Sequence, residues 1–227
     1  MRKEPTFDKI AWIYDFLKYP IFGKAIEESQ NILIPFIPAK AKVLIIGGGT
    51  GKLLPKILQQ EKGVKITYME LSEQMIKAAR KRLRPEQQAQ VDFMCGKIDL
   101  IVGKEFDVII TPFVLDMYSQ EGLKELMREL DQLLKKNGLW LFADFDVISK
   151  NPIVRKSQLF LVWLMYRFFA LTTSLATKSL PDYSAAFSLL GYSVIFKDMR
   201  FGKLIHSRVY APFSTNINLN IRNRIQK

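Results

Sequence analysis

The feature that constrains this chain most is an apolar run that ends in a glycine cluster, VLIIGGGTG at residues 43–51. Four branched aliphatic residues in succession are typical of a strand buried on both faces of a parallel sheet. Gly47, Gly49 and Gly51 then give the spacing G-x-G-x-G, which lets the backbone turn sharply and lets a ligand approach main-chain atoms. Residues 53–58 are expected to form the next helix. The run therefore predicts a strand, a glycine turn and a helix.

The glycine spacing distinguishes three kinds of nucleotide site. A phosphate-binding loop of the type G-x-x-x-x-G-K-[ST] would need glycine in place of Ile46 and a hydroxyl in place of Leu53. The dinucleotide pattern G-x-G-x-x-G would need glycine in place of Lys52. A second short strand, residues 65–70, ends in Glu70 about twenty residues beyond the turn, where a carboxylate can accept hydrogen bonds from both hydroxyls of a ribose. The pattern indicates a nucleoside ligand without a pyrophosphate.

Five segments of the chain together resemble the class I (Rossmann-like) S-adenosylmethionine-dependent methyltransferases. Residues 43–51 resemble motif I of that family, residues 70–75 its post-I motif, and FDVIIT at residues 106–111 its motif IV. Residues 190–202 resemble its closing strand pair. The N-terminal segment FDKIAWIYD, residues 7–15, is similar to that of the branch that includes the ubiquinone/menaquinone C-methyltransferases and some phospholipid N-methyltransferases.

The alternation of strand and helix patterns favours an α/β layer structure. The resemblance implies a Rossmann-like, seven-stranded, mostly parallel sheet of order 3-2-1-4-5-7-6, with strand seven antiparallel and a helical cap. A chain of 227 residues with 48% apolar content suits a single domain. Its expected parts are an N-terminal helical lid (1–40), a cofactor-binding core (41–150), a hydrophobic cap helix (151–180), a last helix with an antiparallel strand pair (181–211) and a basic tail (212–227).

The resemblance also implies S-adenosylmethionine as the cofactor and gives roles to individual residues. The glycine loop would admit the methionine part, Glu70 would hold the ribose, and Tyr14 would close over the methionine end. Leu71, Met75 and Ile98 would sandwich the adenine. The cofactor-binding candidates are Tyr14, Gly47, Gly48, Gly49, Gly51, Glu70, Leu71, Met75, Lys97, Ile98 and Thr111.

Two positions differ from the family pattern. Ile45 stands where motif I usually has an acidic residue, and Lys97 stands where an aspartate usually lies near the adenine amino group. Asp99 could replace that aspartate if its loop shifts. These two differences keep open a second interpretation, a non-catalytic binding or scaffold protein with the same fold.

The acceptor is expected at the carboxyl ends of the strands, where open α/β sheets bind their ligands. Candidates for its pocket are Trp12, Pro112, Phe113, Asp116, Trp163 and Tyr166. No catalytic residue is assigned, and Asp116 and Asp144 are the candidates for an acid or base. Asp144 and Asp146, both at the end of the fifth strand, could deprotonate a substrate, although loop solvation and capping explain such carboxylates equally well. The single histidine, His206, has no acidic neighbour in sequence and fits a structural role. The single cysteine, Cys95, shows no metal-ligand spacing, so no metal is predicted.

Residues 159–175 are apolar on every face apart from Arg167 and the late threonines and serine. The run is shorter than the roughly 20 residues that span a bilayer, so a transmembrane helix is not predicted. A helix that is apolar all round is buried or meets a partner. The sheet domain, a second subunit of a homodimer or an anionic membrane surface could cover it, and we expect it to form a wall of the acceptor pocket.

The net charge of +12 is concentrated in the last third, since residues 151–227 carry 11 basic and 2 acidic side chains. Such a surface can attract anionic lipid, nucleic acid or an acidic substrate, or serve solubility alone. An RNA or protein methyltransferase is the alternative that uses it, but TPFV at residues 111–114 replaces the Asn/Asp-Pro-Pro-Tyr/Phe signature of that branch. We therefore expect a methyltransferase acting on a small, apolar or lipid-like acceptor. The first residues lack the apolar stretch of a secretory signal, so a cytoplasmic enzyme is expected.

Overall fold

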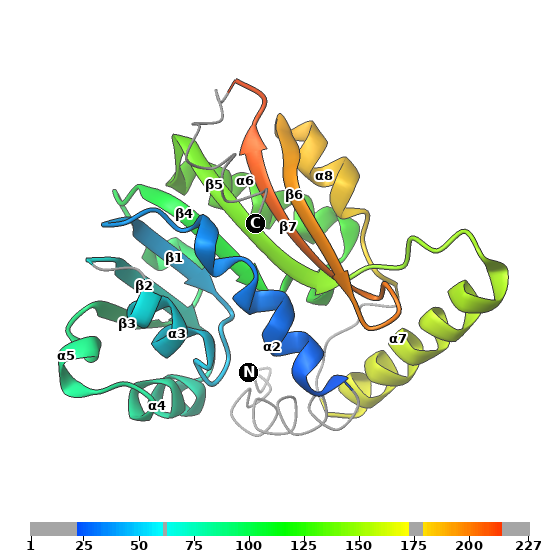
Figure 1. Ribbon diagram of the computed structural model, residues 1–227, viewed down its shortest axis with the longest axis horizontal. Coiled ribbons are helices and arrows are strands. Elements are labelled where there is room, and N and C mark those ends of the chain that lie inside the picture. The colour runs from blue at the N-terminus through cyan, green and yellow to red at the C-terminus, as the bar shows by residue number, and fades with distance from the viewer. Residues whose placement is uncertain (1–21, 61–62, 173–178, 215–227) are drawn as a thin grey trace, which may run out of the picture.

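The computed structural model describes residues 22–60, 63–172 and 179–214, which form one sheet with helices on both faces (Figure 1). The strand order is β3-β2-β1-β4-β5-β7-β6. β7 is antiparallel to both of its neighbours, and the other pairings are parallel. The predicted topology is confirmed. The strands are β1 (Lys42–Ile46), β2 (Lys65–Glu70), β3 (Val91–Cys95), β4 (Phe106–Pro112), β5 (Leu134–Phe145), β6 (Tyr192–Arg200) and β7 (Ile205–Pro212).

Two apolar clusters lie on opposite faces of the sheet. The first joins side chains from α2, α3 and α4 to the sheet, and the second joins side chains from α6 and α8 to its other face. The helices are α2 (Lys24–Asn31), α3 (Leu53–Gln60), α4 (Glu73–Lys81), α5 (Pro85–Gln88), α6 (Gln120–Leu133), α7 (Pro152–Thr172) and α8 (Tyr183–Leu189), and the 3-10 turns are η1 (Ile34–Phe36), η2 (Ile98–Leu100) and η3 (Leu115–Met117). The central strands are therefore covered on both sides, as their unbroken apolar runs require.

Short polar side chains begin several of these helices. Ser72 Oγ accepts the Met75 N–H at the start of α4, and Ser119 Oγ accepts the Gly122 N–H at the start of α6. Asn151 precedes α7, and its Oδ1 accepts the N–H groups of the second and third helical residues. Each such oxygen satisfies a backbone donor that the helix leaves unpaired.

The boundary between α6 and β5 differs from the sequence pattern. The apolar stripe of residues 120–136 predicts a helix that ends at Asn137–Gly138, but α6 ends at Leu133 and β5 begins at the next residue. Leu134 pairs with Phe106 at the start of β4, and Lys135 Nζ lies 2.6 Å from Asp107 Oδ1. Sheet pairing thus overrides the local helical preference.

The described part of the predicted lid packs on the sheet. The ring of Phe22 lies 4.9 Å, centroid to centroid, from both Phe145 and Phe201, and Ser207 Oγ donates to the Ser29 carbonyl at 2.7 Å. In Figure 1, α2 crosses in front of the sheet beside β7. The remainder of the lid, residues 1–21, lies outside the described residues, as does the tail from residue 215 onward.

Candidate functional site at the carboxyl edge of the sheet

The glycine loop after β1 depends on its glycines for two separate reasons. Gly47, Gly49 and Gly51 have φ angles of +66°, +62° and +74°, a region that residues with a Cβ rarely adopt. A Cβ on Gly47 would also lie 2.7 Å from the Val114 side chain, and one on Gly51 would lie 2.6 Å from the Ala79 Cβ. The loop therefore has the conformation and the close contacts that the sequence spacing predicts.

Tyr68 of β2 contacts this loop and fixes its position, a role that was not predicted from the sequence. Its hydroxyl donates to the Gly49 carbonyl at 2.6 Å, and its ring is buried. A Cβ on Gly48 would lie 2.4 Å from that ring. Tyr68 pairs with Ile45 in the sheet, and Ile45 is fully buried in the core. The side chain at the position where the family usually has an acid thus packs in the core, and a tyrosine on the adjacent strand contacts the loop.

Glu70, the last residue of β2, connects the loop to the strand end. Its Oε2 accepts the Gly49 N–H at 3.0 Å, and its Oε1 accepts the Leu71 N–H at 2.8 Å. Both bonds fix the carboxylate beside the glycine loop at the carboxyl edge. An ionised carboxylate accepts on about four lone-pair sites, which suits the paired hydroxyl donors of a ribose. The carboxylate and the glycine cradle therefore fit a nucleoside cofactor.

The ends of β2 and β3 bring the adenine candidates to one place. Glu70 pairs with Cys95, and the Gly96 N–H donates to the Glu70 carbonyl at 3.0 Å. Leu71 is 41% exposed beside this turn, Met75 is buried on α4, and Ile98 is half-buried in η2. Lys97 is exposed just before Ile98. The structure thus places these predicted residues around the same edge, next to Glu70.

The end of β4 is more enclosed than the sequence analysis expected. Thr111 is fully buried, and its Oγ1 accepts the indole N–H of Trp140 at 3.0 Å. Pro112 is buried too, and Phe113 has a φ of +56°, with its ring 5.1 Å from that of Phe145. A bulky residue in this region is strained, and such strain concentrates at functional sites. The aromatic pair packs in the core at the carboxyl ends of β4 and β5.

The two acid–base candidates lie together in the interior. Asp144 is fully buried, and its Oδ2 accepts the N–H groups of Leu115 and Asp116 at 3.0 and 3.2 Å. Its Oδ1 accepts the N–H of Phe145 at 2.9 Å. Asp116 lies in η3 and is 1% exposed. Three backbone donors on one carboxylate suit a role for Asp144 in anchoring the turn after β4 to β5.

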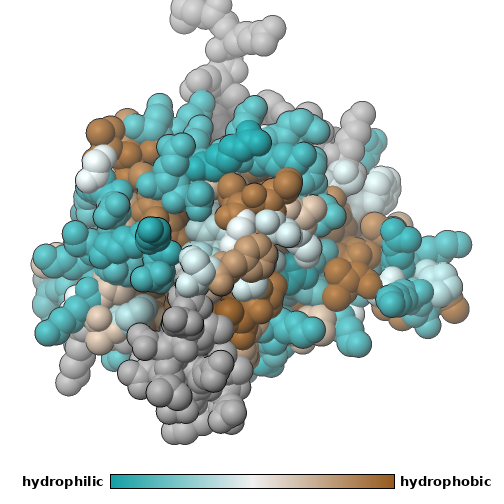
Figure 2. Space-filling model, turned by 90° about the horizontal axis from the view of Figure 1, so that it is seen from above, coloured by the Kyte–Doolittle hydropathy of each residue, from teal (hydrophilic) through white to brown (hydrophobic). Residues whose placement is uncertain are grey.

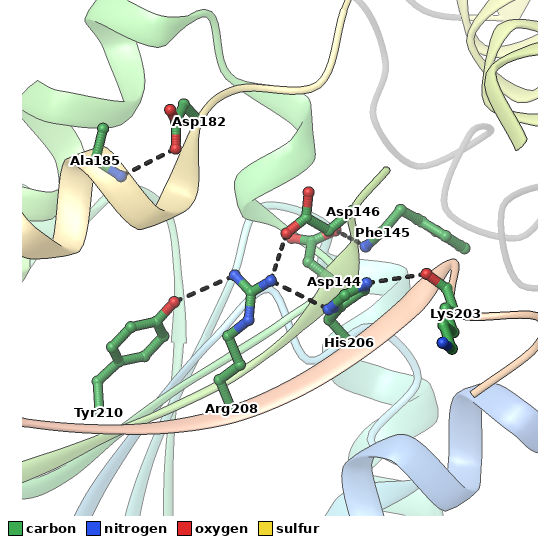
Figure 3. Close-up of polar contacts among 9 residues, drawn as sticks. All are labelled: Asp144, Phe145, Asp146, Asp182, Ala185, Lys203, His206, Arg208 and Tyr210. Carbon is green, nitrogen blue, oxygen red and sulfur yellow. Dashed lines mark hydrogen bonds and ion pairs between the residues drawn. The ribbon is translucent and has the colours of Figure 1, made fainter. Parts of the chain in front are cut away.

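Asp146, the carboxylate that follows Asp144 at this strand end, belongs to a second polar cluster, whose partners on β7 were not predicted (Figure 3). Arg208 of β7 donates from Nη2 to Asp146 Oδ2 and lies 3.1 Å from His206 Nδ1, while its Nη1 donates to the Tyr210 hydroxyl at 3.3 Å. His206, Arg208 and Tyr210 alternate along β7, so they share one face of the sheet. The guanidinium thereby ties the residue after β5 to the face of β7.

The environment of His206 keeps its imidazole neutral. Burial and the nearby positive charge of Arg208 lower the pKa of His206 below its ordinary value. Its Nε2 lies 3.0 Å from the Lys203 carbonyl, and its Nδ1 faces Arg208. A neutral ring that donates from Nε2 and accepts at Nδ1 satisfies both contacts. Both ring nitrogens are thus used inside the protein, which supports the structural role expected from the sequence.

The remaining pocket candidates are only partly described. Trp163 is 55% exposed on α7, and its ring stacks on that of Phe160 at a centroid distance of 5.8 Å. The side chain of Tyr166, together with Trp12 and Tyr14, lies outside the described residues. Their place in the pocket stays a prediction.

Comparison with known proteins agrees with this site. Residues 44–140 match the family described as "Methyltransferase domain". Among curated proteins, the malonyl-[acyl-carrier protein] O-methyltransferase of Halalkalibacterium halodurans is 32% identical over 155 residues, which cover 63% of this chain and 54% of that protein. The protein of the same name from a Paenibacillus species is 24% identical over 160 residues, covering 68% and 56%. The chain thus spans about half the length of the curated relatives it matches.

Solved structures share the fold at low sequence identity. The magnesium protoporphyrin IX methyltransferase from Synechocystis PCC 6803 with bound SAH has a TM-score of 0.57 and 17% identity, covering 83% of this chain and 82% of that one. The [4+2]-cyclase SpnF has a TM-score of 0.65 and 11% identity, covering 92% and 97%.

Residues 44–140 thus match a methyltransferase domain, and the strand order and the glycine loop are those expected for the Rossmann-like S-adenosylmethionine-dependent methyltransferase fold. The cofactor is accordingly S-adenosylmethionine. The N-terminal segment resembles the ubiquinone/menaquinone and phospholipid branch, whereas the curated relatives above are named as malonyl-[acyl-carrier protein] O-methyltransferases.

Proposed function

We propose that the protein transfers the methyl group of S-adenosylmethionine to a small apolar or amphipathic acceptor bound at the carboxyl edge of the sheet. The observation that carries the proposal is the joint geometry of Glu70 and the glycine loop, in which one carboxylate accepts the N–H groups of Gly49 and Leu71. The bound cofactor supplies a methyl group that its sulfonium already activates. The protein therefore has mainly to bind and orient the two reactants.

In this proposal each part of the edge has a separate task. The glycine loop admits the methionine part, and Glu70 accepts the hydrogen bonds of the ribose hydroxyls. Leu71, Met75 and Ile98 enclose the adenine ring with apolar side chains. Tyr68 keeps the loop in place through its bond to the Gly49 carbonyl.

An acceptor that needs no deprotonation by the protein fits this edge best. The Asp144 carboxylate accepts three backbone N–H groups, and both ring nitrogens of His206 face polar groups of the protein. Neither is placed to remove a proton from a ligand. An acceptor that is itself ionised, such as a carboxylate, is already a nucleophile. The names of the curated O-methyltransferases, which act on a malonyl group, support this class of acceptor over a quinone or phospholipid headgroup.

The interior behind the proposed acceptor site is aromatic. Phe113, Phe145 and Phe22 pack ring against ring at the carboxyl end of β4 and β5. These three rings are at most 3% exposed, so they form the apolar interior directly behind this edge.

Calorimetric titration with S-adenosylhomocysteine tests the proposal at its base. We expect saturable binding. A binding free energy weaker than about 4 kcal/mol, which means no binding at about millimolar ligand, would favour the non-catalytic scaffold instead. The second stage is methylation of fatty-acyl and malonyl-type carboxylates, followed by mass spectrometry. Cofactor binding without methylation of any carboxylate would overturn the choice of acceptor and leave the cofactor site standing.

A further inference from the structure

Between residues 152 and 164, helix α7 contacts the described body through side chains that lie on one stripe. Gln158 and Val162, four residues apart, are buried, and Leu161 packs against the core cluster. The side-chain amide of Gln158 donates to the Gly202 carbonyl at 2.7 Å, which ties the helix to the turn between β6 and β7. In Figure 1, α7 projects to the side of the sheet. Most of the side chains at residues 152–164 are therefore exposed.

The surface beyond this stripe is unusually apolar. The α7 outer face consists of Ile153, Leu159, Phe160, Trp163 and Leu164, whose exposed fractions run from 44% to 78%. The stacked pair of Phe160 and Trp163 stands at its centre, 62% and 55% exposed. Contiguous apolar surface of this kind on a protein marks a place where something binds.

The same helix carries only positive charge. Arg155, Lys156 and Arg167 are exposed on α7, and no acidic residue occurs in the sequence between Asp146 and Asp182. On the right of Figure 2, where Figure 1 places α7, hydrophobic and hydrophilic residues lie side by side. The partner must therefore offer apolar material and negative charge together.

We propose that the α7 outer face docks on an anionic membrane surface. A lipid interface supplies acyl chains for Phe160 and Trp163 and anionic headgroups for the basic side chains. A second copy of the chain fits less well, because an α7–α7 contact would bring together two helices that carry only positive charge. None of the helices in the described ranges is long and apolar enough to cross a bilayer, so the contact is with the surface.

Docking through α7 would set the orientation of the carboxyl edge of the sheet, where the glycine loop lies. α7 follows the carboxyl end of β5 after six residues, and the glycine loop follows the carboxyl end of β1 at the same edge of the sheet. The cofactor edge would then lie close to the lipid, where an apolar acceptor dissolves. The inference concerns where the protein binds, so its test needs no acceptor and no cofactor.

Sedimentation of the full chain with vesicles measures the contact directly. We expect binding to vesicles that contain phosphatidylglycerol, little binding to pure phosphatidylcholine, and release at high salt because the attraction is partly electrostatic. The double substitution Arg155→Glu with Lys156→Glu should weaken binding by about tenfold or more, since each basic side chain near an anionic surface adds to the affinity. Phe160→Ser with Trp163→Ser should weaken it at both salt concentrations.

Matched controls lie elsewhere on the surface. Lys77→Glu with Lys81→Glu reverses the same number of exposed charges on α4, and Leu189→Ser removes an exposed apolar side chain from α8. These variants should bind nearly as wild type, and circular dichroism melts confirm that each variant is folded. The inference is overturned by absence of binding at low salt, by equal losses in the α4 variant, or by a dimer that Phe160→Ser with Trp163→Ser dissociates.

Discussion

Replacement of Glu70 by alanine should weaken cofactor binding without unfolding the domain. The carboxylate accepts two backbone N–H groups at 3.0 and 2.8 Å, and in the proposed complex it also accepts the ribose hydroxyls. A hydrogen bond to a charged group is worth about 1.5 to 3 kcal/mol. Because Glu70 is only half-buried, water offsets part of that energy. Loss of even one full bond corresponds to about tenfold, so we expect Glu70→Ala to lose at least that factor in affinity.

Calorimetric titration with S-adenosylhomocysteine measures the affinity, and urea unfolding of the same samples measures stability separately. Glu70→Gln should bind with intermediate affinity, because its amide keeps one acceptor oxygen but presents a donor where the second oxygen stood. Glu73→Ala is the control, since that carboxylate is exposed and its ion pair with Lys77 spans 3.8 Å at the surface. If folded Glu70→Ala binds as tightly as wild type, the ribose lies elsewhere.

Three further predictions concern groups near this edge. Tyr68→Phe removes the donor to the Gly49 carbonyl and should lower the free energy of unfolding by about 0.5 to 1.5 kcal/mol, measured in urea, with weaker binding of S-adenosylhomocysteine. Gly51→Ala should destabilise by at least about 2 kcal/mol, because its Cβ would lie 2.6 Å from the Cβ of Ala79 at a φ of +74°, and an unchanged urea midpoint would contradict the loop geometry. The folded pKa of His206 is lowered, so the unfolded chain binds more protons below pH 6.5. Stability is full above that pH and falls as the pH decreases toward the folded pKa, by at most about 1.4 kcal/mol per pH unit. His206→Gln should remove this component, and an NMR titration of the single imidazole should show a midpoint below 6.5.

Local patterns predicted the parts of the fold that depend on neighbours in sequence. The branched run before Gly47 gave β1, and the Asn151–Pro152 pair gave the start of α7. The full strand order came from the family resemblance. The end of α6 could not be read from residues 120–136, because pairing of Leu134 with Phe106 decides it. Helical periodicity contains no information about that distant partner.

In the site, too, the parts that depend on residues close in sequence were predictable. The glycine loop and Glu70 stand in a recognisable spacing, and the structure places them in contact. The role of Tyr68 could not be predicted, because it follows from the contact of its ring with Gly48, which joins β2 to the loop after β1. The bond between Asp146 and Arg208 spans 62 positions and depends on the register of β7 against β5. The alternation of His206, Arg208 and Tyr210 is visible in the sequence of β7. The sequence does not show that Asp146 lies beside them.

The position of β7 has a consequence for how the chain is made. It is the last strand of the described chain, yet it pairs between β5 and β6 and closes the sheet. All the other described strands leave the ribosome before β7. In a nascent chain β5 and β6 therefore have open edges that can pair with other chains. A protein truncated before residue 205 should therefore aggregate during translation, and even the intact chain has a period in which a chaperone would protect it.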